Sequence, residues 1–385
     1  MVVLDPSTVG TSTSIHATWY PYQRKSFYAN ERFWVFYSYG NDMVFSSSTD
    51  GSTWSSRTIV RTLVETAGRA FSVWFNNTYV FYAARNNRDV YNPRTGKKTT
   101  YYEIYFRRGT PNSDGTITWS NEATAVSSIS SISFPSLSVD SEGFPWIGYY
   151  LYAVTNQPYV TKSSTNDGTW TTASGFPYRL SLTSAEWCVI PVPLTATKMF
   201  VIYGTGNSTV KAQSWNGSVW SGEIATASAL EYVYASAVAE EDDVHLTFLK
   251  VTDYDILYVK YNYNTNSFGS ETTLQAGATS DSAPVISRDD SNNLYVFWAG
   301  YPTANHIYYR KYNGTWQDRV DWIDESADVL TDNDLLTCFY QSYSNKIGLT
   351  YMTKTASPYN VRFAFLSTIP PVEFASKRLL VGVGV

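Results

Sequence analysis

The sequence predicts an all-β protein, a seven-bladed β-propeller of four-stranded antiparallel blades. Two observations predict it: a composition typical of pleated strands, and a hairpin motif that recurs about every 50 residues. Aromatic residues make up 17% of the 385 residues, and charged residues only 16%. Aromatic side chains favour half-buried strands, whereas helix surfaces favour Ala, Leu, Glu and Lys. A chain of this length can form one large β domain with its own core.

A polar turn followed by an aromatic residue recurs along the chain. The six copies span Ser48–Trp54, Ser113–Trp119, Thr165–Trp170, Asn216–Trp220, Asn264–Phe268 and Asn313–Trp316. Their aromatic residues are separated by 65, 51, 50, 48 and 48 positions. Asp-Gly and Asn-Gly are preferred at the centre of tight hairpin turns because both central residues need positive φ. The motif therefore predicts one β-hairpin per repeat.

A strand rich in aromatic and β-branched residues precedes each turn. Seven such strands are expected, at Phe33–Tyr37, Tyr79–Tyr82, Trp146–Tyr150, Phe200–Tyr203, His245–Phe248, Tyr295–Trp298 and Gly348–Tyr351. A short strand precedes each of these strands and a third strand follows it. With the strand after the hairpin turn, the repeating unit has four strands. Radial stacking around a channel buries both faces of such a sheet. A β-sandwich, a β-solenoid and a ring of six or eight blades are the alternatives, and the steady period favours the seven-bladed propeller.

We expect one propeller domain over residues 1–374 and a C-terminal tail over 375–385. The blades are expected over residues 11–62, 63–128, 129–183, 184–229, 230–278, 279–330 and 331–374. The last blade lacks a hairpin of the repeating type, so its outer strand must come from Ile369–Phe374 or from the N-terminal Val2–Asp5. We favour the second option, in which residues 1–6 close the ring.

Residues 48–54 resemble the Asp-box, the Ser-x-Asp-x-Gly-x-Thr-Trp hairpin of sialidases and other BNR-repeat proteins. The copy here is one residue shorter, and those at 113–119 and 165–170 are further variants. The resemblance implies a sialidase-like propeller with these hairpins on the face opposite the active site. It also implies that Asp caps the turn, Gly supplies positive φ and Trp packs between blades. The residues concerned are Asp50, Gly51, Trp54, Asp114, Gly115, Trp119, Asp167, Gly168 and Trp170.

Charge and sequence pattern disfavour several classes of protein. The net charge is −5 and no basic stripe occurs, so we expect no nucleic-acid partner. No apolar run reaches the length of a membrane span, and the first residues do not resemble a signal peptide. Cys188 and Cys338 fall on inner strands of separate blades, so we expect buried thiols without a disulfide.

Ligands of propellers usually bind at the mouth where the inner strands begin, and loops there carry the candidate residues. The catalytic candidates are the carboxylates Glu186, Glu231, Asp281 and Asp334. The ligand-binding candidates are Arg69, Arg85, Arg88, Tyr91, Tyr232, Tyr254 and Tyr301. We expect no cofactor, although clustered carboxylates could hold a Ca²⁺ ion.

Sialidase activity is disfavoured by the residues at this mouth. Sialidases use three arginines on the substrate carboxylate and a Tyr nucleophile assisted by Glu. Only Arg69 lies at the start of an inner strand, and the Arg-Ile-Pro motif is absent. Glu231 and Tyr232 are sequence neighbours, so their side chains would leave a strand on opposite faces. Other glycosidases need only two carboxylates, which leaves that chemistry open.

The sequence thus favours a non-catalytic surface propeller that recognises a glycan or a protein. We expect it on a virion or outside the cell, with oligomerisation through the C-terminal tail as an option. The alternative is a glycoside hydrolase or lyase that uses carboxylates at the mouth.

Overall fold

The computed structural model describes residues 5–63, 67–152, 156–182, 187–204 and 206–368. These residues form antiparallel strands and one short 3₁₀ helix, η1 (Gly68–Ala70). The strands are grouped in six sheets. The protein is therefore all-β, as its composition predicts. Among the described residues, no helix is long and apolar enough to cross a membrane.

Five of the sheets follow one plan, in which three or four strands run in chain order from the axis outward. The first has β2 (Ser26–Ala29), β3 (Arg32–Tyr39), β4 (Asp42–Ser48) and β5 (Thr58–Thr62). The second has β6 (Phe71–Phe75), β7 (Val80–Tyr91), β8 (Lys98–Pro111) and β10 (Ala123–Ser128), with β9 (Ile117–Trp119) beside β8. The third has β11 (Ser131–Val139), β12 (Pro145–Tyr152), β13 (Asn156–Lys162) and β14 (Tyr178–Arg179). Another has β23 (Val285–Arg288), β24 (Leu294–Ala299), β25 (His306–Tyr312) and β26 (Val320–Asp324).

The remaining four-stranded sheet joins the first and the last described strands of the chain. It has β27 (Thr337–Cys338), β28 (Lys346–Thr353), β29 (Tyr359–Ser367) and, outermost, the N-terminal β1 (Ser7–Ser12). In the β1–β29 pair, Ser7 lies opposite Phe363 and Ser12 opposite Tyr359. The sequence analysis placed the closing strand at Val2–Asp5, and the strand that pairs lies slightly later. Residues 2–4 and 369–374 lie outside the described residues.

The largest sheet has eight strands because one long strand pairs with one strand along its first part and with another along its second part. It contains β15 (Cys188–Pro193), β16 (Met199–Gly204), β17 (Thr209–Trp215), β18 (Ile224–Glu240), β19 (Asp243–Lys250), β20 (Ile256–Asn262), β21 (Ser267–Phe268) and β22 (Thr272–Gln275). The first part of β18 pairs with β17 up to Ala229. From Leu230 onward it pairs with β19 instead. An outer strand thus continues directly into the next inner strand, and the sheets count as six.

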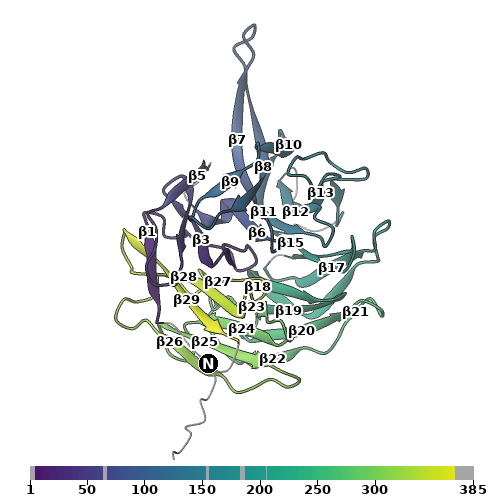
Figure 1. Cartoon of the computed structure of the whole chain (residues 1–385). Coiled ribbons are helices and arrows are strands. Elements are labelled where there is room, and N and C mark those ends of the chain that lie inside the picture. Colours follow the sequence, from purple (N-terminus) through teal and green to yellow (C-terminus); the bar gives the residue numbers. More distant parts are fainter. Residues whose placement is uncertain (1–4, 64–66, 153–155, 183–186, 205, 369–385) are drawn as a thin grey trace, which may run out of the picture.

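The innermost strands lie side by side around a central axis, as in a β-propeller (Figure 1). Side-chain hydroxyls connect them: the Ser72 Oγ on β6 accepts from the Leu137 N–H on β11. The Ser236 Oγ on β18 accepts in the same way from the Ile286 N–H on β23. The hydroxyl of Thr337 on β27 donates to the Gln23 carbonyl, just before β2. These contacts join neighbouring inner strands, and Arg288 of β23 forms a parallel bridge with Gln341, just after β27, so those two strands run in the same direction.

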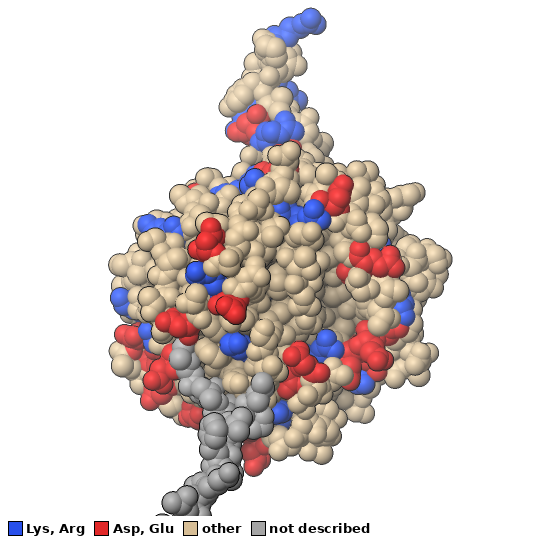
Figure 2. Space-filling model, viewed as in Figure 1, with Lys and Arg blue, Asp and Glu red and all other residues tan. Residues whose placement is uncertain are grey.

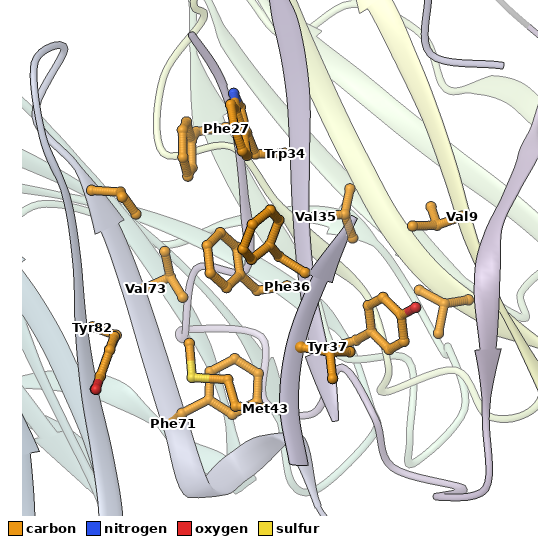
Figure 3. Close-up of a cluster of buried hydrophobic side chains, with 14 of the residues drawn as sticks. Val9, Phe27, Trp34, Val35, Phe36, Tyr37, Met43, Phe71, Val73 and Tyr82 are labelled. Carbon is orange, nitrogen blue, oxygen red and sulfur yellow. The ribbon is translucent and has the colours of Figure 1, made fainter. Parts of the chain in front are cut away.

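The core lies between the sheets, so both faces of the second strands are buried. In Figure 3, Phe36 lies beside Val73, whereas Val35 and Tyr37 point to the opposite side, towards Val9. Successive residues of a strand face opposite ways. A strand buried on both faces therefore reads as a continuous apolar run, which explains the sequence of β3.

The recurring hairpins connect the third strand of a sheet to its outer strand. The Asp50 carboxylate accepts the Ser52 and Thr53 N–H groups, and Gly51 has a φ of 78°. Asp114 and Asp167 accept from the residue two positions later, and the glycines that follow them also have positive φ. The Asp carboxylates thus cap the turns, as the resemblance implies.

Each of these hairpins also contacts the preceding sheet. The Trp54 ring packs edge-on against Phe363 of β29, and Trp170 packs against Phe106 of β8. Trp119 packs against Tyr82 within its own sheet and borders the core cluster shared with the first sheet. The hairpins therefore join neighbouring sheets at the end of the molecule opposite the inner-strand starts.

A long hairpin formed by β7 and β8 projects from the body (Figure 1). Lys and Arg side chains gather towards its tip, whereas both charge signs are interspersed on the rest of the face that Figure 2 shows. Cys188 and Cys338 are buried free thiols, as predicted.

Candidate functional site

The mouth at the inner-strand starts is lined by an aromatic cluster. His16 stacks on Trp19, with ring centroids 4.1 Å apart. The Tyr20 hydroxyl lies 3.0 Å from that of Tyr232, and Trp187 packs edge-on against Tyr232 at 5.7 Å. Trp187 is 37% exposed, while Trp19 and Tyr232 are half-buried. The cluster thus presents aromatic rings to solvent and buries Tyr20 beneath them. We call His16, Trp19, Trp187 and Tyr232 the mouth aromatics.

Backbone irregularities bring these rings together. β18 has a register shift between Leu230 and Ala235, where Tyr232 adopts a φ of 46°. A non-glycine residue in this left-handed region is uncommon and marks a local constraint. The shift turns Tyr232 towards Trp19, in the loop before β2. The simple alternation that the sequence analysis applied to Glu231 and Tyr232 therefore does not hold in this part of β18.

Asp334 lies beneath the mouth aromatics and is 4% exposed. Its Oδ2 accepts from the Trp19 indole N–H at 2.6 Å and from the Tyr234 hydroxyl at 2.8 Å. Its Oδ1 is buried without a hydrogen-bond partner among the described residues. Burial, followed by the charge of Asp332, raises the pKa of Asp334 to about 7. The carboxyl group therefore changes protonation near neutral pH.

Asp281 and Asp332 form a second acidic group nearby. Burial and the neighbouring Asp281 carboxylate raise the pKa of Asp332 to about 6. The pKa of Asp281 is lowered; burial alone would raise it, and hydrogen bonds from Thr279, Asp332 and Asn333 outweigh that effect. The Asn333 side-chain amide donates to Asp281 Oδ2 at 3.1 Å. The pKa values of the two acids are thus shifted in opposite directions, and Asn333 donates to both carboxylates.

Arginines occupy the other side of the mouth. The Arg69 guanidinium lies 5.2 Å from the Trp19 ring centroid and 5.1 Å from that of Phe134. It lies close enough to His16 to help lower the pKa of that imidazole, although burial is the larger cause. Arg85 lies near Tyr150. The mouth therefore combines aromatic rings with arginines on one side and carboxyl groups on the other.

Three consecutive side chains close the channel below the mouth. The Gln23 amide donates to the carbonyls of Arg69 and Pro135. The Arg24 guanidinium donates to those of Ala237, Ile286 and Cys338, on three different inner strands. The Lys25 ammonium donates to the carbonyls of Gly68 and Phe71. Burial lowers the pKa of Lys25 well below its usual value. We call Gln23–Lys25 the channel plug.

The other candidates from the sequence analysis are placed as follows. Arg88 and Tyr91 lie on the projecting hairpin, where Arg88 forms an ion pair with Glu103 at 2.8 Å and Tyr91 is 64% exposed. Tyr254 and Tyr301 lie in the β19–β20 and β24–β25 turns, half-buried against the core. Burial raises the pKa of Glu231. Glu186 lies outside the described residues.

Sequence reasoning missed Trp19, Tyr234, Asp332 and Trp187 as site residues. The aromatic run from Trp19 to Tyr22 was a signal that could have found the first. Asp332 lies two positions before the candidate Asp334, and this acidic pair in the turn before β27 was a signal that could have found it. Among the described residues, no three His, Cys, Asp or Glu side chains are grouped to hold a metal ion.

No protein-family model and no curated protein sequence matches the chain. Among solved structures, a protein of unknown function from Dyadobacter fermentans has a TM-score of 0.50 at 10% identity, over 95% of this chain and 98% of that one. The polysaccharide lyase Uly1 has a TM-score of 0.52 at 9% identity, over 91% and 90% of the two chains. The Aleuria aurantia lectin, in complex with a fucosylated disaccharide, has a TM-score of 0.44 at 14% identity, over 75% of this chain and 98% of that one. At these identities the first two likenesses show a shared fold alone.

Proposed function

We propose that this protein is a non-catalytic, sialidase-like propeller of seven blades that binds a glycan at the mouth aromatics. The count of seven treats the eight-stranded sheet as two blades, divided where β18 changes partner between Ala229 and Leu230. The hairpins with capped Asp turns support the sialidase-like assignment.

The observation that carries the binding function is the half-exposed ring surface of Trp19, Trp187 and Tyr232. Aromatic faces stack on the apolar faces of sugar rings, and rigid rings lose little conformational entropy on binding. Arg69 and the Asp281–Asp332 pair lie around these rings and can bond sugar hydroxyls. That a polysaccharide lyase shares the fold agrees with a carbohydrate ligand, although it names no substrate for this chain.

The same geometry disfavours hydrolysis by the predicted carboxylates. A glycosidase needs two carboxyl groups that face each other across about 5–10 Å of open space. Asp334 is buried and bonded to Trp19 and Tyr234, and Asp281 is bonded to Asn333. The channel plug closes the passage beneath them. Asp334 and Asp281 therefore do not offer an open carboxylate pair.

One observation favours the enzyme as second candidate: the pKa of Asp334 lies near 7, as that of a general acid does. A panel of chromogenic glycosides tests it. Hydrolysis abolished by Asp334→Asn, Asp281→Asn or Glu186→Gln would support the enzyme and refute the binding-only function.

A glycan array followed by titration calorimetry on the best ligand tests the binding function. We expect Trp187→Ala to weaken binding about tenfold or more, because it removes an exposed ring from the contact surface. Tyr91→Ala is the matched control, since it removes an exposed ring from the projecting hairpin. Equal affinity of Trp187→Ala, Tyr232→Ala and the unchanged protein would refute the site. A protein partner, a virion or extracellular location, and oligomerisation through residues 375–385 stay predictions.

A further inference from the structure

A cavity lies at the end of the channel opposite the mouth, on the face of the recurring hairpins. Its volume is about 390 Å³. The walls are the turns that follow the inner strands, and the channel plug separates it from the mouth. None of the predicted ligand-binding residues lines this cavity.

Two aromatic rings form the inner part of this axial cavity. Trp74 and Tyr340 pack together with centroids 4.5 Å apart, and both are less than 10% exposed. Tyr340 is fixed by its hydroxyl, which accepts from the Ala239 N–H at 2.9 Å. Arg24 of the plug lies 5.4 Å from the Tyr340 ring centroid. The cavity thus has a rigid apolar floor.

Arg288 supplies a positive charge in the cavity wall. Its guanidinium donates to the side-chain oxygens of Asn292 at 2.9 Å and Gln341 at 3.4 Å, which are both neutral. Its Nε is buried without an acceptor among the described residues. A guanidinium has five N–H donors, so these two bonds leave three without a partner there. A guanidinium held by amides keeps its charge available, and it is suited to bind a carboxylate in bidentate fashion.

The acids around Arg288 do not neutralise it. Asp140, which also lines the cavity, is bonded to the Trp146 indole N–H and lies 3.4 Å from Lys162. The carboxylate of Asp289 accepts from Asn293 and Tyr295. Glu241 lines the cavity with an exposed side chain, so water screens its charge. An incoming anion would therefore meet Arg288 as a cation without a carboxylate partner.

We propose that the axial cavity binds a small carboxylate whose ring presents a flat apolar face. The carboxylate bonds Arg288, the ring packs on Trp74, and Asn77 can bond further polar groups of the ligand. The volume lies near the lower end of the range for small-molecule sites, which limits the ligand to one or two rings. A hexuronate and an aromatic carboxylate both carry this chemistry. The site is independent of the glycan surface at the mouth.

Titration calorimetry of the full chain tests the proposal with three probes: galacturonate, phenylacetate and the neutral methyl glucoside. We expect one of the two carboxylates to bind and methyl glucoside not to bind. The carboxylate that binds identifies the source as a sugar acid or an aromatic acid. Arg288→Gln should weaken this binding about tenfold or more, because a charge-assisted hydrogen bond is lost. Arg319→Gln, a change at an exposed arginine just before β26, should leave it unchanged.

A second variant tests the cavity independently if Arg288→Gln fails to fold. Ser141→Phe places a bulky ring at the rim of the cavity and leaves Arg288 intact, so it should abolish carboxylate binding while the thermal midpoint stays close to that of the unchanged protein. Carboxylate binding that persists in both variants, or no binding of either carboxylate at millimolar concentration, would overturn the proposal. Glycan binding at the mouth should be unaffected by Ser141→Phe, so failure of one site is distinguishable from failure of the other.

Discussion

Asp334→Asn should change how the stability of the protein depends on pH. The carboxyl has a pKa of about 7 in the folded protein, against 3.8 for an ordinary Asp. Between these values the folded protein holds a proton that the unfolded chain has lost, so stability falls as pH rises from about 4 to about 7. At about 1.4 kcal/mol per pKa unit, the full effect of this one group is at most about 4 kcal/mol. Above pH 7 its contribution no longer changes.

Asn keeps the shape of the side chain and an oxygen that can accept from Trp19 and Tyr234, but it carries no titrating proton. Relative to the unchanged protein, the variant should therefore gain stability between about pH 4 and pH 8, by up to about 4 kcal/mol. Urea unfolding followed by Trp fluorescence at a series of pH values measures this difference. Asp114→Asn is the control with the opposite sign, because hydrogen bonds from Thr116 lower the pKa of that exposed carboxyl. Parallel pH profiles for the Asp334 variant and the unchanged protein would refute the reasoning.

Three further predictions concern the fold. Gly168→Ala should lower the free energy of unfolding by about 1–2 kcal/mol, because the φ of this residue is 99° and the added Cβ would lie 2.8 Å from Arg108 Nε. A urea unfolding curve that matches that of the unchanged protein would contradict this prediction. Deletion of residues 1–12 removes β1 and the hydrogen bond from the Trp54 indole to Ser7, so calorimetry should show a lower and broader thermal unfolding transition. An unchanged thermal transition would mean that β1 does not close the ring. Arg24→Met removes the guanidinium that donates to carbonyls on three inner strands. The Ile286 carbonyl keeps the Cys338 thiol as a donor, whereas the carbonyls of Ala237 and Cys338 lose the Arg24 bond at about 1–3 kcal/mol each, so we expect little folded protein by circular dichroism. A midpoint equal to that of the unchanged protein would contradict the plug.

The strands could be predicted because burial on both faces leaves a strong signal. The run Phe33–Tyr37 is apolar at every position, and the structure packs alternate residues of β3 against different neighbours. The recurring turns were equally visible, since Asp or Asn followed by Gly meets a local need for capping and positive φ. Both signals are local in sequence, so they need no knowledge of which sheets meet.

The continuity of β18 could not be read in the same way. Residues 224–240 form one strand, although the sequence pattern suggests two elements that meet near residue 230. Ala229 and Leu230 belong to different pairings within that strand, and nothing in their side chains distinguishes a turn from a strand that changes partner. The count of sheets depends on this one junction.

The mouth was found only in part, because its chemistry depends on contacts between residues far apart in the chain. Asp334 and Asp281 were candidates as open carboxylates, but Trp19 lies 315 positions from the Asp334 it bonds. The structure buries this carboxyl group beneath the mouth aromatics and bonds it to Trp19 and Tyr234, contacts that no local pattern in the sequence indicates.

The channel plug could not be predicted for the same reason, since it also depends on contacts between residues far apart in the chain. Gln23, Arg24 and Lys25 were not among the predicted site residues, and Lys and Arg are almost never fully buried unless paired. Here the partners are main-chain carbonyls, which every residue carries and which leave no mark in the sequence. Only the ring of inner strands brings those carbonyls to one point. Because the plug fills that point, the two ends of the channel can bind different ligands, and a variant at one end should leave binding at the other unchanged.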